Sequence, residues 1–249
     1  MSSHLDYLLR LADTSLILGQ RLSEWCGHGP VLEEDLALTN VALDCIGQAR
    51  LLLAHAAAVE GQGRDEDQLA FLRADGRYRN LTLVELPNGD FGATVIRNFL
   101  VTAWQAQVWA SLADSTDRAL AGIAEKSAKE TRYHVSHAAD WTIRLGDGTD
   151  ESHARMQSAL DSLWPYTAEF FAADPVDEAV AAAGIAPLCS TLEGAWSATV
   201  VPVLQEATLT VPGRSPFRSR GKAGVHTEHL GHLLAGMQHL QRAYPGGQW

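Results

Sequence analysis

Cysteine is scarce in this sequence. The three cysteines, Cys26, Cys45 and Cys189, lie far apart and form no Cys-x-x-Cys motif. Small domains that depend on disulfide bonds carry several cysteines in short, regular spacings. The cysteine pattern therefore argues against a disulfide framework and fits a protein of the reducing cytoplasm.

Long apolar runs and an excess of positive charge are also missing. No apolar run reaches the roughly 20 residues of a membrane-spanning helix, and the start, MSSHLDYLLRLADTSL, has neither the basic region nor the apolar core of a secretory signal. With 19 Lys and Arg against 30 Asp and Glu, the formal net charge is -11. Nucleic-acid binding needs clustered basic side chains. We therefore expect a cytoplasmic protein with neither a membrane nor a nucleic-acid partner.

Apolar residues recur with helical spacing along almost the whole chain. This pattern predicts long helices at residues 4–25, 33–60, 91–113 and 115–145, followed by helices near 150–173, 190–209 and 225–243. Neither strand alternation nor an internal repeat is evident. The sequence predicts one all-α domain over residues 1–249, with a bundle core at about 4–146 and about three further helices at about 150–243.

Several residues refine the expected helix ends. Asp65 opens a short helix and Asp90 caps the helix that follows it. Ser190–Glu193 reads as a capping box for the helix near 190–209. Pro165 and Pro202 fall inside predicted helices and are expected to kink them.

The stretch KETRYHVSHAADW, residues 129–141, places Glu130, His134 and His137 in one predicted helix. Helical proteins with a di-iron site use Glu-x-x-His pairs, because this spacing puts the carboxylate and the imidazole on one helix face. Here the residue three places after Glu130 is Tyr133. In the helix predicted at 33–60, Asp44 is likewise followed three places later by Gly47, which has no side chain.

A di-iron bundle needs a Glu from each of two helices and a Glu-x-x-His pair from each of the other two. The helix predicted at 91–113 contains no Asp, Glu, His or Cys. We therefore expect no catalytic residue and no metal site on this chain. In its place we expect a hydrogen-bonded network, with Gln48, Tyr133, Arg50 and Arg132 as candidate partners of Glu130 and Asp44. The alternative is a di-metal carboxylate oxidase, or a metal-binding ferritin-like enzyme, with unusual ligands.

The segment HTEHLGH repeats histidine every third residue, at His226, His229 and His232. Over these steps the three side chains would roughly share one face of a helix. A zinc site needs three or four converging ligands, usually from more than one segment, and the sequence offers no second histidine-rich or cysteine-rich segment. A mononuclear zinc enzyme is thus the weaker hypothesis, and helix capping or partner contacts are favoured.

Several of these stretches together resemble one family. The matching segments include QRLSEWCGHGP, EEDLALTNVALDCIGQAR, LVELPNGDF, AKETRYH, RLGDGTD and GVHTEHLGHLL. They run from the first predicted helix to the last, so the resemblance covers essentially the whole chain. The chain resembles the C subunits of the bacterial phenylacetyl-CoA epoxidase, a multicomponent oxygenase of phenylacetate catabolism.

The resemblance implies a ferritin-like fold and a structural role. In such a complex the di-iron site lies in a homologous A subunit, and the C subunit is its non-catalytic partner in a heterodimer or higher assembly. Asp44, Gly47, Glu130 and Tyr133 would then be vestigial ligand positions. A separate reductase with flavin and an iron–sulfur centre would supply electrons from NADPH, and none of this chemistry would reside on the present chain.

A basic segment, RSPFRSRGK, interrupts the otherwise acidic sequence. It contains Arg214, Arg218, Arg220 and Lys222. Guanidinium groups suit phosphate and carboxylate partners. The segment is therefore either a solvated loop, a docking site for an acidic patch of a partner, or a contact with the phosphates of CoA.

Overall fold

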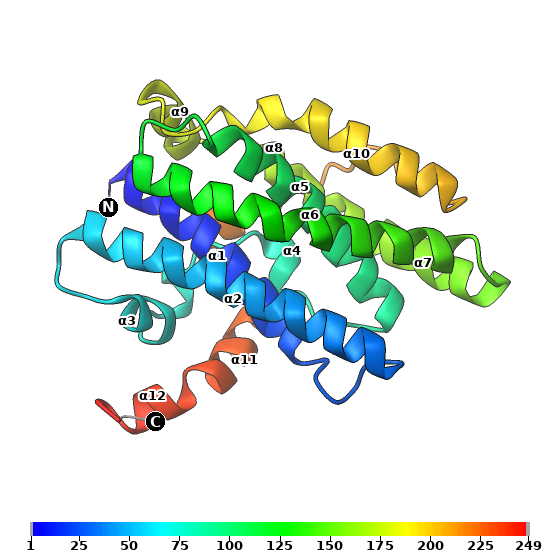
Figure 1. The fold of residues 1–249 in the computed structure, drawn as a ribbon, viewed down its shortest axis with the longest axis horizontal. Coiled ribbons are helices and arrows are strands. Elements are labelled where there is room, and N and C mark those ends of the chain that lie inside the picture. The colour runs from blue at the N-terminus through cyan, green and yellow to red at the C-terminus, as the bar shows by residue number, and fades with distance from the viewer. Residues whose placement is uncertain (1, 248–249) are drawn as a thin grey trace. The chain divides into compact units, whose positions relative to one another are not determined.

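The computed structural model of the chain describes residues 2–247 (Figure 1). Its contacts gather into two compact units. Unit 1 comprises Met1–Pro87 and Arg220–Trp249, and unit 2 comprises Asn88–Ser219. The single domain expected from the sequence stays a prediction, and each unit is described by itself.

The predicted fold class, all-α and ferritin-like, is confirmed. Within residues 2–247 no strand forms, and an isolated bridge joins Arg220 to Val225. The helices of unit 1 are α1 (Ser3–Ser23), α2 (Leu32–Glu60), α3 (Glu66–Phe71), η1 (Asp75–Arg77), α4 (Thr82–Glu85), η4 (Gly221–Ala223), α11 (Glu228–Met237) and α12 (His239–Ala243). Those of unit 2 are α5 (Phe91–Leu112), α6 (Arg118–Gly146), α7 (Asp150–Leu163), η2 (Trp164–Thr167), α8 (Ala168–Phe171), α9 (Pro175–Ala182), η3 (Cys189–Leu192) and α10 (Glu193–Glu206).

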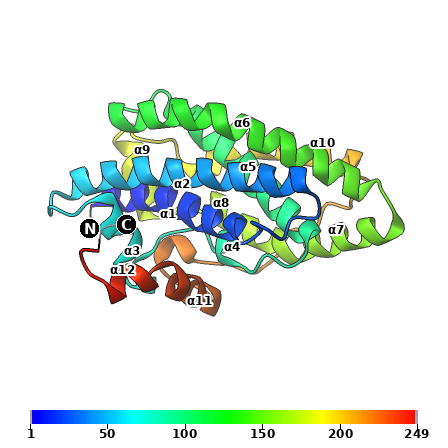
Figure 2. The ribbon, with the colours of Figure 1, turned by 60° about the horizontal axis from the view of Figure 1, so that its bottom comes forward.

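Unit 1 is built on the antiparallel pair α1–α2, whose helices lie side by side in Figures 1 and 2. A tight turn joins them, with Gly27 in the left-handed region at φ 80°. The Asp35 carboxylate, in the first turn of α2, accepts hydrogen bonds from the backbone N–H groups of Gly27 and Gly29 at 2.7 and 3.1 Å. The acid thus fixes the turn and also suits the positive end of the α2 dipole.

The C-terminal helices α11 and α12 pack on the segment that connects α3 to α4 (Figure 2). The backbone passes very close to this segment at Gly221, where a side-chain carbon would collide with the carbonyl oxygen of Asn80. Gly221 N–H donates to Thr82 Oγ1 at 3.0 Å. Only glycine allows this approach, so the last segment of the chain is an integral part of unit 1.

Unit 2 is built on the pair α5–α6, which the short connection between them predicts to be antiparallel. Asp90 and Asp117 cap these two helices, since their carboxylates accept from Ala93 N–H and from Leu120 N–H at 2.8 and 3.1 Å. The helix expected near 150–173 divides at Pro165 into α7, η2 and α8. Pro165 thus ends the α-helix instead of only kinking it.

The start of α10 differs from the prediction. A capping box at Ser190–Glu193 is wrong, because α10 begins at Glu193 after Leu192, which makes no side-chain cap. The Thr191 hydroxyl donates instead to the Leu188 carbonyl at 2.7 Å, within the 3-10 turn η3. Helix α10 then continues through Pro202.

Candidate functional site

The stretch around Glu130 lies on α6, as predicted, but its orientation differs from the prediction. The Tyr133 side chain is 52% exposed, whereas His134 is buried. The buried row of α6 includes Ser127, Thr131 and His134, so Tyr133 does not take the inward position that the Glu-x-x-His comparison gave it. Helical rotation of about 100° per residue accounts for the difference.

Glu130 lies beside this buried row and pairs along the helix. Its carboxylate is 3.0 Å from the ammonium of Lys126, one turn earlier on α6. Such i, i+4 pairs contribute only about 0.3–0.5 kcal/mol. One partner of Glu130 is thus a surface lysine.

On α2, too, the buried positions lie one residue away from those that the Glu-x-x-His comparison gave. Gly47 has open space where a side-chain carbon would project, and Asp44 is half-buried. The buried positions are Cys45 and Gln48, a thiol and an amide. Gln48 is buried, and the hydrogen-bonded network predicted to include it stays a prediction. The vestigial role of Asp44, Gly47, Glu130 and Tyr133 remains a prediction.

The residues present do not fit a di-iron centre. In unit 2 the buried polar groups of α5 include Asn98, Thr102 and Gln105, and α6 adds the hydroxyls of Ser127 and Thr131. Amide and hydroxyl oxygens are weak ligands for iron, which binds carboxylate and imidazole in such bundles. His134 is the one imidazole among the buried residues that the structure describes on these two helices, and none of those buried residues is an acid.

The buried acid of α1 already has a partner. Asp13 is fully buried. Both terminal nitrogens of the Arg73 guanidinium donate hydrogen bonds to its carboxylate, one of them at 2.9 Å. The backbone N–H of Arg79 donates to the same carboxylate at 2.8 Å. The Arg73 guanidinium therefore neutralises this carboxylate, and Asp13 acts as a structural anion.

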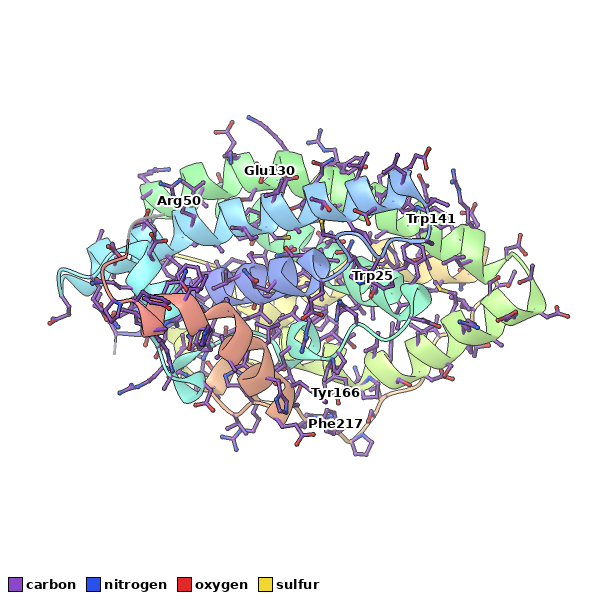
Figure 3. The ribbon with its side chains drawn as sticks, turned by 90° about the horizontal axis from the view of Figure 1, so that it is seen from below. Trp25, Arg50, Glu130, Trp141, Tyr166 and Phe217 are labelled. Atoms are coloured by element: carbon purple, nitrogen blue, oxygen red, sulfur yellow. The ribbon has the colours of Figure 1, made fainter. Side chains whose placement is uncertain are left out.

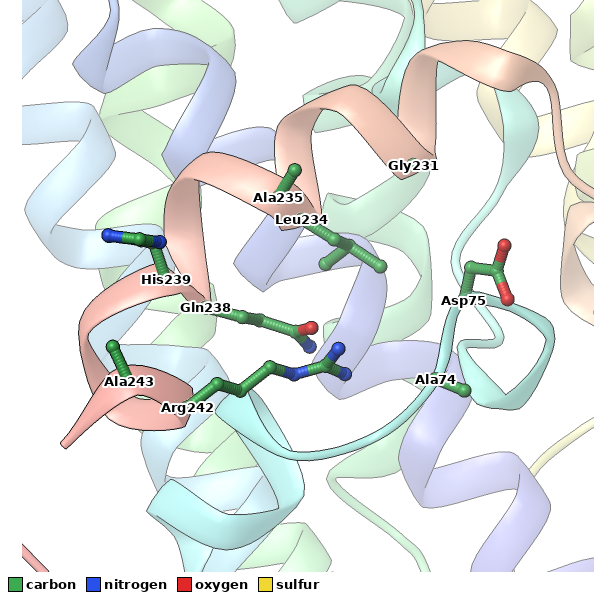
Figure 4. A pocket seen from close by; sticks show the side chains of 9 residues that line it. All are labelled: Ala74, Asp75, Gly231, Leu234, Ala235, Gln238, His239, Arg242 and Ala243. Carbon is green, nitrogen blue, oxygen red and sulfur yellow. The ribbon is translucent and has the colours of Figure 1, made fainter. Parts of the chain in front are cut away.

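Arg73 ties this pair to the C-terminal helices. Its guanidinium lies 4.3 Å from the centre of the Tyr78 ring. Gln238 donates to the carbonyl of Arg73 at 2.9 Å and to the Tyr78 hydroxyl oxygen at 2.8 Å, and Arg242 donates to the Arg73 carbonyl at 3.0 Å. Figure 4 shows Gln238 and Arg242 reaching from this segment toward the chain at Ala74.

The electrostatics of this network favour the charged pair. Burial alone would lower the pKa of Arg73, but the charge and hydrogen bonds of Asp13 outweigh it and raise that pKa. Burial raises the pKa of Tyr78 to about 12. Arg73 thus stays cationic and Tyr78 stays a neutral hydroxyl at physiological pH.

A second buried acid, Glu85, binds the segment that contains the three histidines. Its carboxylate accepts from His226 Nδ1 at 2.7 Å, from Thr227 N–H at 2.6 Å and from Asn80 at 2.8 Å. His226 Nε2 lies 3.0 Å from the carbonyl oxygen of Tyr78. Both ring nitrogens thus face oxygen acceptors, an arrangement that favours the doubly protonated imidazolium.

The three histidines predicted as a weak metal alternative do not come together. Helix α11 begins at Glu228, so His226 precedes it and turns toward Glu85, while His232 is exposed. The carbonyl of His229 accepts from Arg21 at 3.4 Å. Among the residues the structure describes, these three form no metal-holding group. The segment instead anchors the C-terminal part of unit 1 to Glu85 through His226.

The His226–Glu85 contact predicts a pH dependence of stability. Burial lowers the pKa of His226, but the hydrogen bond and charge of Glu85 outweigh burial and raise that pKa above its ordinary 6.5. The stabilisation is therefore complete below about pH 6.5 and is lost as the pH rises through the folded-state pKa. We expect His226→Gln to lower the free energy of unfolding by about 2 kcal/mol at pH 6 and by less at pH 9.

Urea unfolding of both proteins across this pH range measures the difference. The control is His232→Gln, because His232 is exposed and makes no such contact. A stability gap between wild type and His226→Gln that stays constant with pH would contradict the imidazolium assignment.

The basic residues of the segment RSPFRSRGK divide between the two units. Arg214 and Arg218 belong to unit 2, where they border a cleft with Trp164 and Trp196. Arg220 belongs to unit 1 and is exposed, and Lys222 is buried there in the turn η4. The function of these four residues remains a proposal.

Exposed leucines lie along one side of α2, among polar residues such as Arg50. Leu32, Leu36, Leu43 and Leu51 project from it, and Gly47 lies between them with open space beside it. These positions fall within about 100° of the helix circumference. We call this set the outward face of α2, and sequence periodicity missed it because α2 is apolar on most sides.

The same composition makes α2 long and apolar enough to cross a membrane by length and sequence alone, contrary to the expectation that no such run exists. In the structure, 44% of its most apolar window is buried. Its buried side packs against α1, as a core helix does. The absence of a membrane partner stays a prediction.

The fold defines a ferritin-like helical protein, and the buried acids Asp13 and Glu85 of its unit 1 are bound by Arg73 and His226. Residues 1–249 match the family described as phenylacetic acid catabolic protein. The chain belongs to this family. It is 51% identical over 243 residues, which are 98% of each chain, to the C subunit of 1,2-phenylacetyl-CoA epoxidase from Escherichia coli (strain K12).

Proposed function

We propose that this chain is the non-catalytic structural subunit of a multicomponent phenylacetyl-CoA ring epoxidase in aerobic phenylacetate catabolism. It binds and stabilises a homologous catalytic A subunit, which holds the di-iron site. It carries no cofactor itself, and the flavin, iron–sulfur centre and NADPH belong to a separate reductase. The identity to an epoxidase C subunit over 98% of the chain supports this role.

The set of buried side chains carries the proposal. Helix α5 has no metal-ligating side chain, and Asp13 of α1 is already paired with Arg73. Two iron ions with too few carboxylates and imidazoles around them would not be held. A chain of this composition can contribute to an oxygenase by shaping and supporting a partner.

The outward face of α2 offers a surface on which the catalytic subunit can bind. Its leucines place exposed apolar side chains along α2, and large exposed apolar patches mark interaction sites. Gly47 lets a facing backbone come close, because no side chain stands there. A helix of the homologous catalytic subunit is the occupant that this strip suits.

The metal content of the purified chain tests the proposal directly. Produced in iron-supplemented cells without its partner, the chain is expected to hold less than about 0.2 iron per molecule, because the buried polar side chains of α5 and α6 are mostly amides and hydroxyls and Asp13 is already paired with Arg73. Elemental analysis gives the ratio. About two irons per chain, together with oxygen consumption in the presence of a reductant, would establish the di-metal oxidase instead.

Co-expression with the catalytic subunit tests the partner. A tagged chain is expected to retain that subunit through size-exclusion chromatography, and the purified complex, not the isolated chain, is expected to contain the iron. The matched control is the same tagged chain expressed with the reductase alone. A chain that elutes by itself in the presence of the catalytic subunit would contradict the proposed binding of that subunit.

A further inference from the structure

Unit 2 contains a cleft of about 420 Å³ between the η2–α8 segment, the start of α10 and the loop that follows α10. Three aromatic residues line it. Trp196 is buried, and its indole N–H donates to the carbonyl of Leu100 at 3.1 Å. The rings of Trp164 and Phe171 each lie 5.4 Å from the Trp196 ring. The wall of the cleft is therefore a set of fixed, flat apolar surfaces.

Charged side chains stand at the rim of the same cleft. Arg214 is 98% exposed, with its guanidinium 4.0 Å from the Glu193 carboxylate. Arg218 is held in place, because its Nη1 donates to the carbonyls of Ser215 and Phe217 at 2.7 Å. A guanidinium has five N–H donors, so Arg218 keeps donors for another group.

The loop that presents the arginines is anchored to the aromatic segment. Phe217 packs edge-on against Tyr166 of η2, with ring centres 4.9 Å apart (Figure 3). Next to Arg218, the Ser219 hydroxyl donates to the buried Glu169 carboxylate of α8 at 2.7 Å. Arg218 is thus held beside the cleft by contacts on both sides of it in sequence.

Flat aromatic walls, guanidinium groups and a carboxylate suit one class of small molecule. Planar bases stack on indole and phenyl rings. Phosphate oxygens bind arginine, and a carboxylate such as Glu193 accepts hydrogen bonds from an exocyclic amine. The volume also lies in the range of small-molecule sites. An isolated acidic side chain would use the arginines but not the aromatic walls.

We propose that this cleft binds the phosphorylated adenosine group of a nucleotide, with the base against Trp164 and the phosphates at Arg214 and Arg218. The inference goes beyond the proposed function, because a purely structural subunit needs no ligand. ADP and CoA share this group, and CoA carries an additional phosphate on its ribose. The two sources are distinguished by the test.

Titration of the full chain with ADP, CoA and inorganic phosphate, followed by tryptophan fluorescence, provides the test. Saturable quenching by the nucleotides is expected with a Kd on the order of 100 µM. A tighter Kd for CoA than for ADP would assign the site to CoA, and equal values would assign it to adenine nucleotides in general. No saturable quenching by either, or equal binding of phosphate alone, would overturn the proposal.

Variants locate the effect in the cleft. Arg218→Ala and Trp164→Ala are each expected to raise the Kd about tenfold, through a lost charged hydrogen bond and a lost stacking surface respectively. Trp164→Phe keeps a stacking ring and is expected to stay within about threefold of wild type in ligand-detected NMR. Arg155→Ala is the matched control, since Arg155 is an exposed arginine of α7 outside the cleft. Equal weakening by Arg155→Ala and Arg218→Ala would show nonspecific charge attraction and refute the site.

Discussion

Replacing Leu43 by Glu on the outward face of α2 is expected to weaken binding of the catalytic subunit about 100-fold. Leu43 is 61% exposed in the isolated chain, so the change leaves its fold intact. In the complex, a carboxylate at this point would be buried against an apolar helix without a partner, and such burial is costly. Titration calorimetry with the purified catalytic subunit measures the change.

The control replaces another exposed leucine. Leu72, at the end of α3, is 51% exposed and does not belong to the outward face of α2. Leu72→Glu adds the same charge to a similarly exposed position and is expected to keep the wild-type Kd. If Leu43→Glu binds as tightly as Leu72→Glu, the partner docks elsewhere.

Replacing Arg73 by Met is expected to lower the free energy of unfolding by about 4 kcal/mol. Asp13 is fully buried, and the variant would leave its carboxylate without the guanidinium that neutralises it. Gln238 and Arg242 bond to the backbone of residue 73, so the C-terminal helices would also loosen. Chemical denaturation followed by circular dichroism measures the loss.

The double variant Asp13→Leu with Arg73→Met tests the cause. It removes both charges, so stability is expected to recover by about 2 kcal/mol or more relative to Arg73→Met alone. Arg64→Met is the surface control, because Arg64 is itself exposed where it pairs with Glu60 at the end of α2, and the expected change is below about 0.5 kcal/mol. A double variant no more stable than Arg73→Met would show that packing, not charge, dominates.

Helical periodicity predicted the long helices to within a few residues. The first expected helix, 4–25, corresponds to Ser3–Ser23, and 91–113 corresponds to Phe91–Leu112. Prediction failed where tertiary contacts decide. The last helix, expected at 225–243, divides near Gln238, whose side chain bonds to Arg73 and Tyr78. No local sequence pattern predicts a hydrogen-bond partner so distant in the chain.

The candidate site was harder to predict than the helices. The empty ligand set of α5 could be read directly from its sequence. Which residues of α6 are buried could not be read from its sequence. Thr131 and His134 are polar and buried, whereas Tyr133 is aromatic and exposed, and this reverses the usual burial preference of these residue types. Asp13 was the signal that could have revealed the first network, as an acid inside the leucine-rich first helix. Its partner Arg73 lies outside that helix and required the structure.

The discontinuity of unit 1 has a consequence for synthesis. Residues 88–219 form unit 2 without interruption, whereas unit 1 needs residues 220–243 to complete it. On the ribosome, α1 and α2 therefore emerge long before the helices that cover Tyr78 and supply His226 to Glu85. Unit 2 can mature first, and the nascent α1–α2 hairpin stays open to chaperones and proteases until translation nears its end.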